Sequence, residues 1–128
     1  EGASKLIEVT VSGAASVAEA RLAARTVVTS PLVKTAVYGN DPNWGRIVAA
    51  VGRSGAGVTG SELDLYVGNI CLVKAGYPLP FDKEKVVAVL SSSEVLVSVR
   101  LNQGTAKATA WGCDLSEAYV TINSRYTT

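Results

Sequence analysis

The chain of 128 residues contains no histidine and no methionine. The missing histidine removes the most common general base, proton shuttle and metal ligand from any chemistry that the chain performs alone. The missing methionine means that the sequence does not begin at a start codon, so we expect a processed, cut or excerpted part of a longer polypeptide. An enzyme built on this chain must therefore work without imidazole, or with groups that lie on another chain.

Cysteines are also scarce. Cys71 and Cys113 are isolated and share no C-x-x-C spacing, so neither a zinc site nor a redox dithiol is indicated. A disulfide between them is one alternative, and two buried free thiols are the favoured one. No apolar run approaches the roughly 18 residues that a membrane span needs, and no signal peptide is visible, so we expect a soluble chain. The net charge of +1 gives no electrostatic reason to expect nucleic acid or an anionic membrane as a partner.

The residues that are present suit a single α+β domain. Hydrophobic residues make up 48% of the chain and aromatic residues only 6%, a composition typical of a sheet packed on helices. Alternation over 6–12 predicts a half-buried strand. A capping box from Ser16 to Glu19 opens a helix that we expect to end near Thr29, before Ser30-Pro31. Residues 32–38 are predicted to form a short strand.

The second half adds hairpin and helix signals. In order, we predict strands at 63–67 and 70–73 around a Gly68-Asn69 turn, an extended connection at 77–80, a helix from its cap Asp82 to Leu90, and a strand at 95–101. A turn at 102–104 leads into a partner strand at 105–111. Asp114 and Glu117 have capping-box spacing, which predicts a closing helix at 115–125. The fold class that follows is α+β, a layered arrangement of sheet and helices with antiparallel hairpins.

The segment from Gly39 to Ile47, Gly-Asn-Asp-Pro-Asn-Trp-Gly-Arg-Ile, is the most distinctive one. Asp41 and Pro42 are typical of an N-cap and a first helical position, and an apolar stripe follows at Trp44, Ile47, Val48 and Val51. The favoured interpretation is a braced helix start, with Trp44 in the core and Arg46 paired with an acid. The alternative is that Arg46 and Asn43 border a site for an anionic carboxylate near the helix N-terminus.

The glycine-rich stretch at 52–60 invites comparison with a phosphate-binding loop. It lacks the Gly-Lys-Ser/Thr ending of a P-loop, and it follows a helix rather than a strand. We therefore interpret it as a flexible loop.

Three blocks of the sequence resemble the ornithine acetyltransferase family, enzymes of arginine biosynthesis that are also called glutamate N-acetyltransferases. The blocks are Glu-Gly-Ala-Ser-Lys at 1–5, Ser-Pro-Leu-Val-Lys-Thr-Ala at 30–36 running into Asp-Pro-Asn-Trp-Gly-Arg-Ile at 41–47, and Trp-Gly-Cys-Asp-Leu at 111–115 with Tyr-Val, Ile-Asn and Tyr-Thr-Thr behind it. Their order and spacing match along essentially the whole chain. The middle block is the specific one.

The resemblance implies an enzyme similar to the αββα N-terminal-nucleophile enzymes. In that family a precursor cuts itself before a threonine, whose freed α-amine can serve as the base for its own hydroxyl. The threonine takes acetyl from N-acetylornithine and passes it to glutamate in a ping-pong cycle. The resemblance places this threonine on a companion segment, before Glu1, and makes this chain the C-terminal part of a cytoplasmic enzyme that needs no cofactor and assembles as a dimer of paired segments.

The resemblance also implies three substrate-binding residues, Glu1, Asn123 and Thr128. A carboxylate can hold an ammonium group, and an amide or a hydroxyl can hold either end of an amino acid. Without the resemblance these residues would be interpreted as a solvated terminal residue, an exposed polar residue and a frayed end. Ser4 stands where the family often has threonine, and the hydroxyl is kept. The alternative for the whole chain is a non-catalytic α+β interaction domain with purely structural blocks.

Overall fold

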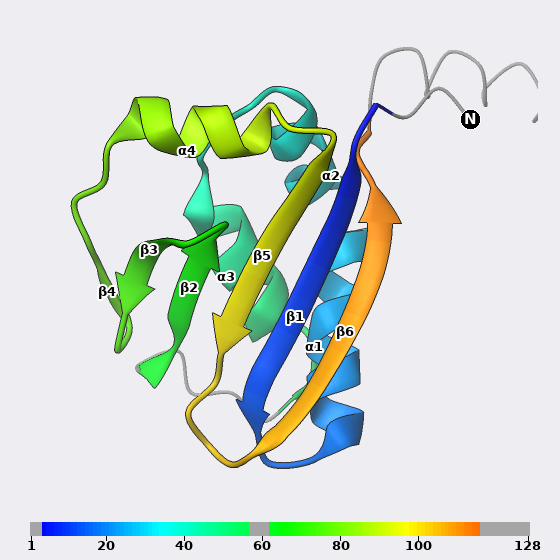
Figure 1. Cartoon of the computed structure of the whole chain (residues 1–128). Coiled ribbons are helices and arrows are strands. Elements are labelled where there is room, and N and C mark those ends of the chain that lie inside the picture. Colours follow the sequence, from blue (N-terminus) through cyan, green and yellow to red (C-terminus); the bar gives the residue numbers. More distant parts are fainter. Residues whose placement is uncertain (1–3, 57–61, 116–128) are drawn as a thin grey trace, which may run out of the picture.

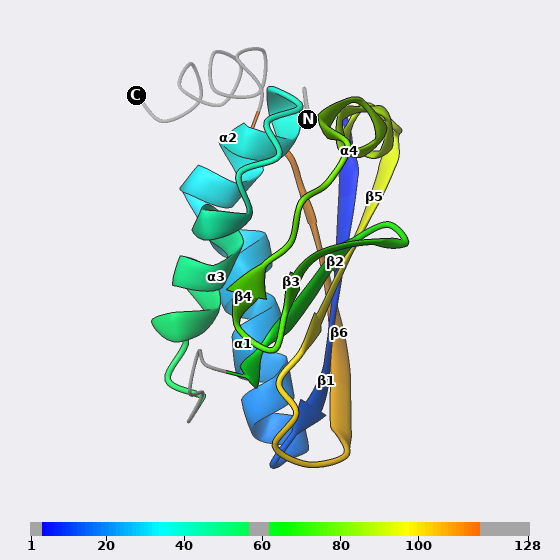
Figure 2. The same ribbon diagram turned by 90° about the vertical axis from the view of Figure 1, so that its left-hand side faces the viewer.

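A computed structural model describes residues 4–56 and 62–115 of the chain. They form one six-stranded mixed sheet in the order β4-β3-β2-β5-β1-β6. In chain order the elements are β1 (Leu6–Ala14), α1 (Val17–Thr29), α2 (Pro31–Tyr38), α3 (Trp44–Gly52), β2 (Asp64–Val67), β3 (Ile70–Lys74), β4 (Tyr77–Pro78), α4 (Lys83–Leu90), β5 (Glu94–Arg100) and β6 (Ala106–Cys113). Helices α1, α2 and α3 cover one face of the sheet, and α4 lies across one end (Figure 1, Figure 2). The predicted α+β layering is confirmed.

The core lies between the sheet and the three helices on its covered face. On β1 the predicted alternation is confirmed, since Ile7, Val9 and Val11 are fully buried. Strand β1 pairs in parallel with β5 and antiparallel with β6. Helix α1 begins as predicted, because the Ser16 hydroxyl accepts a hydrogen bond from the Glu19 amide at 3.1 Å. Its buried face is mostly alanine and valine, which lets the helix lie close to the sheet.

Helix α2 replaces the strand predicted at 32–38, so that prediction was wrong. Ser30 is the N-cap, and its hydroxyl accepts a hydrogen bond from the Val33 amide at 3.4 Å. Pro31 follows at the first helical position, where no amide donor is needed. The buried side chains Val33, Ala36 and Val37 have the spacing of a helix face. The Ser-Pro pair therefore ends one helix and starts the next.

Helix α3 begins later than the predicted cap at Asp41 and Pro42. Its first residue is Trp44 and its N-cap position is Asn43, whose side chain makes no capping hydrogen bond. The apolar stripe itself is confirmed, because Ile47 and Val51 are buried and Trp44 and Val48 pack against the core.

The end of α2 explains the late start of α3. Asn40 has a positive φ of 54°, and its amide donates to the Val37 carbonyl at 3.2 Å. The Asp41 amide donates to the Ala36 carbonyl at 2.8 Å. These two bonds form a Schellman motif, the helix ending in which one left-handed residue satisfies the last carbonyls. Residues 40 and 41 therefore end α2 rather than begin α3.

Strands β5 and β6 do not pair with each other, so the hairpin predicted around 102–104 was wrong. Strand β1 lies between them, and the connection crosses the end of β1 instead of turning tightly. The amides of Gln103 and Gly104 both donate to the Gly13 carbonyl, at 2.7 and 2.8 Å. A side chain at Gly104 would place its Cβ 2.5 Å from the Ala14 carbonyl oxygen. This crossing requires glycine at position 104.

The other elements predicted within the described residues agree with the structure. Strands β2 and β3 form an antiparallel hairpin around residues 68–69, and the Asp82 side chain caps α4 through the Glu84 amide. Both cysteines are free thiols, as favoured. The expectation that both are buried was wrong, because Cys71 is half-buried and Cys113 is exposed. They lie on β3 and β6, roughly 20 Å apart at the usual strand spacing, too far for a disulfide.

Candidate functional site

Asp114 is the centre of a hydrogen-bonded corner where the two ends of the described chain meet. Its side chain is fully buried. One carboxylate oxygen, Oδ1, accepts the backbone amides of Ser4 and Lys5, each at 2.9 Å. The other, Oδ2, accepts the Ser4 hydroxyl at 2.5 Å. Because a buried carboxylate is stable only when its oxygens are satisfied, this geometry fixes the residues before β1 against the end of β6.

Backbone hydrogen bonds extend the same corner to α2. The Asp114 amide donates to the Lys5 carbonyl at 3.2 Å, and the Leu115 amide donates to the Lys34 carbonyl at the same distance. The chain that leaves β6 is therefore held by β1 on one side and by α2 on the other.

Lys5 connects the corner to the distinctive segment at 39–47. Its ammonium group donates to the Val37 carbonyl at 2.6 Å and to the side-chain oxygen of Asn40. Both acceptors lie at the C-terminal end of α2, where free carbonyls and the helix dipole favour a cation. The sequence indicates only a surface or strand-end lysine here. Its partner could not be predicted, because the contact depends on how α2 packs.

The opposite charges of Asp114 and Lys5 at the corner each favour the ionised form of the other. Burial by itself would raise the pKa of Asp114, but hydrogen bonds from the Ser4 hydroxyl and from the Lys5 and Ser4 amides, with the charge of Lys5, bring that pKa below its ordinary value. Burial lowers the pKa of Lys5, and the negative charge of Asp114 opposes that shift. The carboxylate is therefore ionised at neutral pH.

The three blocks that carry the family resemblance thus meet at one place. Ser4 and Lys5 belong to the first block, Lys34 belongs to the middle block, and Asp114 and Leu115 belong to the third. Sequence reasoning missed this role for Asp114, which it interpreted as the start of a capping box for the helix expected at 115–125. That helix lies outside the described residues, apart from Leu115. The sequence does place one polar residue, Ser4, just before β1 and another, Asp114, just after β6, and this was the available signal for their contact.

The predicted substrate-binding residues Glu1, Asn123 and Thr128 also lie outside the described residues. Glu1 precedes Ser4 by three residues, so covalent geometry keeps its Cα within about 11 Å of the Ser4 Cα. The other two residues follow Leu115 along the chain. Their role stays a prediction.

Arg46 lies on the side of α3 that faces α2, and within the described residues it bonds to α2 rather than to the predicted acid. Its guanidinium donates to the Leu32 carbonyl at 2.9 Å and to the Thr35 hydroxyl at 3.3 Å. Asn43 is exposed at the N-cap position. Both side chains are attached to the α2–α3 junction, and whether they border a substrate site stays a prediction.

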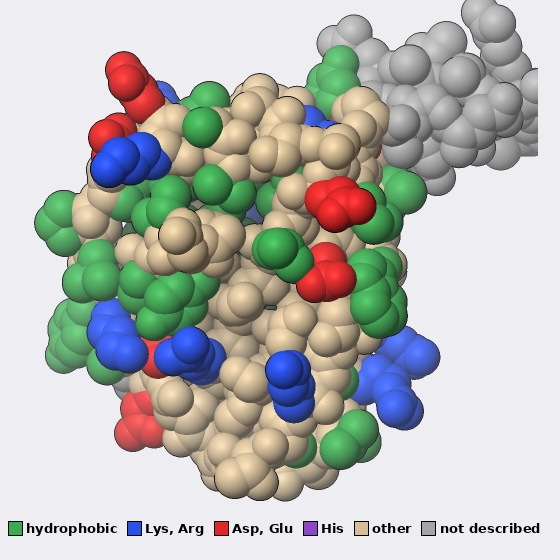
Figure 3. Space-filling view, in the orientation of Figure 1, with side chains coloured by type: hydrophobic (Ala, Val, Ile, Leu, Met, Phe, Trp, Pro, Cys, Tyr) green, Lys and Arg blue, Asp and Glu red, His purple; other side chains and the backbone are tan. Residues whose placement is uncertain are grey.

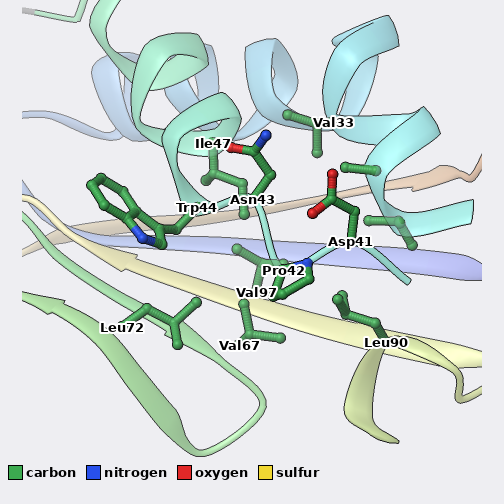
Figure 4. Close-up of a pocket in the computed structure, with 12 residues that line it drawn as sticks. Val33, Asp41, Pro42, Asn43, Trp44, Ile47, Val67, Leu72, Leu90 and Val97 are labelled. Atoms are coloured by element: carbon green, nitrogen blue, oxygen red, sulfur yellow. The ribbon is translucent and has the colours of Figure 1, made fainter. Parts of the chain in front are cut away.

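The distinctive segment also lines a small cavity beneath α2 and α3 (Figure 4). Pro42 and Trp44 face Val67, Leu72 and Val97 of the sheet across it. Its free space is about 20 Å³, enough for roughly one water molecule and too small for an amino acid. In the described part of the chain, Trp44 therefore supports the helix start rather than forming a substrate pocket.

The described residues hold no group of three His, Cys, Asp or Glu side chains that could bind a metal ion. None of the helices described is long and apolar enough to cross a membrane.

A solved structure shares this fold. The crystal structure of the arginine biosynthesis bifunctional protein argJ from Bacillus halodurans matches 98% of this chain and 60% of its own, with a TM-score of 0.95 and 47% sequence identity. The chain is thus a mixed α/β segment of the kind found in proteins of arginine biosynthesis.

Sequence comparison gives the family. Residues 1–128 match the ArgJ family. The arginine biosynthesis bifunctional proteins ArgJ of Bacillus licheniformis and Staphylococcus epidermidis are 52% and 48% identical to it over 128 residues, which is all of this chain. The chain belongs to the ArgJ family. It spans 32% of the length of each of these two relatives.

Proposed function

We propose that this chain is the C-terminal segment of a glutamate N-acetyltransferase, also called ornithine acetyltransferase. The complete enzyme would transfer acetyl from N-acetylornithine to glutamate in the cytoplasm. Two findings support this: the chain belongs to the ArgJ family, and its relatives with bifunctional arginine-biosynthesis names are about three times as long. A companion segment of the same precursor would carry the threonine nucleophile, and two such paired units would form a dimer.

The proposed cycle has two acyl transfers. The threonine hydroxyl attacks the acetyl carbonyl of N-acetylornithine, the amide C–N bond breaks, and the ornithine amine leaves with the proton that the threonine α-amine has taken up. The glutamate amine then attacks the acetyl ester. A new amide forms, the ester C–O bond breaks, and the threonine hydroxyl regains its proton.

The contribution of this chain would be substrate binding. Glu1, Asn123 and Thr128 would hold the charged ends of the two amino acids, and Arg46 with Asn43 would border the site if the helix start takes part. The observation that carries this proposal is the corner at Asp114, which holds the residue three positions after Glu1 beside the chain that leads to Asn123. A buried carboxylate in this place keeps both chain segments in fixed positions.

The test uses the full-length protein. Incubation with N-acetylornithine alone should add the mass of one acetyl group to a peptide that begins with threonine, and glutamate should then remove it as N-acetylglutamate. The variants Glu1→Gln and Asn123→Ala should raise the KM for an amino-acid substrate and leave the amount of folded protein unchanged. The isolated 128-residue chain should be inactive. An acetyl group on a residue of this chain, or unchanged KM values, would contradict the proposal.

A further inference from the structure

Among the described residues, the face of the sheet opposite the three helices is open, and it carries exposed apolar side chains at one end (Figure 3). Leu6 on β1 is 40% exposed, Leu96 on β5 is 51% exposed and Trp111 on β6 is 59% exposed. We call these three residues the apolar patch. Farther along the same face the paired positions are mostly Ser and Thr, namely Ser98, Thr10 and Thr109, as on a sheet face in contact with water.

Strand register places the three patch residues around Glu8. Glu8 on β1 lies opposite Leu96 on β5 and opposite Trp111 on β6. The indole N–H of Trp111 donates to the Glu8 carboxylate at 2.8 Å, which holds the aromatic ring across the strand pair. Leu6 is two positions along β1, so its side chain points to the same face. The patch is therefore preorganised on three neighbouring strands, β5, β1 and the edge strand β6.

Two carboxylates, those of Glu8 and Glu94, lie at the patch. Glu8 lies within it, and Glu94 lies opposite Leu6 at its border. Neither has a cationic partner in the part of the chain that the structure describes, where Lys74 and Asp64 form the ion pair. A surface complementary to the patch would therefore present apolar side chains and at least one lysine or arginine.

The patch lies at the end of the sheet where both ends of the described chain leave. Leu6 follows Ser4 by two residues, and Trp111 precedes Asp114 by three. The B. halodurans chain extends well beyond the matched region, since this chain covers 60% of it. The patch is therefore the part of the open face nearest to both ends of the described chain.

We infer that the apolar patch is the contact surface for the preceding part of the same precursor, which docks with apolar side chains and a basic residue beside Glu8 and Glu94. This inference rests on the proposed placement of the chain as a C-terminal segment. A second copy fits less well. In a two-fold contact centred on the patch the same residues face each other, so Glu8 and Glu94 would meet their own copies with no cation between them, which destabilises a sheet contact.

The experiment places a photo-crosslinking residue in the full-length protein. In one variant Leu96 is replaced by p-benzoylphenylalanine, and in a second variant Trp111 is replaced by it. The second variant exchanges one aromatic side chain for another, so it serves if the first variant folds poorly. The matched control is the same replacement at Leu22, which is 44% exposed on α1, away from the open face. After irradiation, mass spectrometry identifies the cross-linked peptides.

Cross-links from positions 96 and 111 to peptides that precede Glu1 in the precursor, with far fewer from position 22, support the inference. Cross-links to peptides within 1–128 of another copy would overturn it, as would the absence of cross-links in folded protein or an equal yield from position 22. Acetyl transfer is measured on the same preparations. Because docking is detected without turnover, a failure of the proposed function and a failure of this inference are distinguishable.

Discussion

The Ser4 hydroxyl donates to the Asp114 carboxylate at 2.5 Å, a bond between residues 110 positions apart in the sequence. It ties the residues before β1 to the residue after the edge strand β6. The same carboxylate also accepts two backbone amides, so three donors depend on one buried side chain.

Replacing Asp114 with alanine should therefore be costly. The variant leaves the donors of Ser4 and Lys5 without their acceptor, and a lost hydrogen bond to a charged group costs about 1.5 to 3 kcal/mol of folding free energy. Asp114→Asn keeps one acceptor oxygen and should lose less. Urea denaturation followed by tryptophan fluorescence measures both, with Ser4→Ala as the control that removes only the hydroxyl. Equal stability of Asp114→Ala and Ser4→Ala would show that the amide bonds contribute nothing.

The same residue should make stability depend on pH. The pKa of Asp114 is lowered in the folded chain from its ordinary value of 3.8, so below pH 3.8 the unfolded chain binds more protons than the folded one. The contribution of Asp114 is then fully present above pH 3.8 and is lost as pH falls through the lower folded pKa. The stability difference between the wild type and Asp114→Asn should shrink on acidification, measured as urea midpoints from pH 6 downward. Asp64, whose pKa is also lowered, remains in both proteins, so a difference that persists unchanged at acidic pH would contradict the assignment.

Asn40 combines two roles that substitutions can separate. Its positive φ of 54° costs an ordinary L-residue about 1 to 2 kcal/mol, and its side-chain oxygen accepts the Lys5 ammonium. Asn40→Gly removes only the side-chain bond, because glycine tolerates this backbone. Asn40→Ala removes the bond and adds strain. We expect the alanine variant to have a free energy of unfolding about 1 kcal/mol lower than that of the glycine variant, and therefore a lower thermal midpoint. Equal midpoints would argue against the strained ending of α2.

Gly104 and Gly52 give a matched pair of glycine-to-alanine variants. A Cβ at position 104 would lie 2.5 Å from the Ala14 carbonyl oxygen, whereas a Cβ at position 52 meets nothing within 4 Å. Gly104→Ala should therefore lose about 1 to 3 kcal/mol of stability through overpacking. Gly52→Ala, in the last position of α3, should be neutral or gain up to about 1 kcal/mol. Thermal unfolding compares them, and similar losses in both would contradict the close crossing over β1.

The sequence predicts the elements of this fold better than their arrangement. Strand β1 and helix α1 carry strong local signals, the period-2 alternation and the Ser16 cap, and both are confirmed. Helix α2 was mistaken for a strand because its apolar residues form a short run, in which helix and strand periods are hard to distinguish. The Ser30-Pro31 pair was interpreted as a stop signal only, although it also fits an N-cap and first helical position.

Long-range pairing is the part that local patterns do not contain. The separation of β5 from β6 depends on β1, which lies about 100 residues before β6 in register, as in the pairing of Thr10 with Thr109. The corner at Asp114 has the same origin, since its partners are remote in sequence. The three family blocks could be found from the sequence, but their meeting at one corner follows only from the sheet order.

Arg46 offers the sharpest test of the distinctive segment. Its guanidinium bonds to the Leu32 carbonyl and the Thr35 hydroxyl, so Arg46→Ala should loosen α3 from α2 and cost about 1 kcal/mol, the usual net worth of such hydrogen bonds. Arg46→Lys retains a positive charge but not the planar fork. If the side chain only braces the helices, both variants lower the thermal midpoint and leave the KM values of the full-length enzyme for N-acetylornithine and glutamate unchanged, which is the outcome we expect. If Arg46 instead attracts a substrate carboxylate, Arg46→Ala raises the KM for glutamate and Arg46→Lys partly restores it, and the braced interpretation is then wrong.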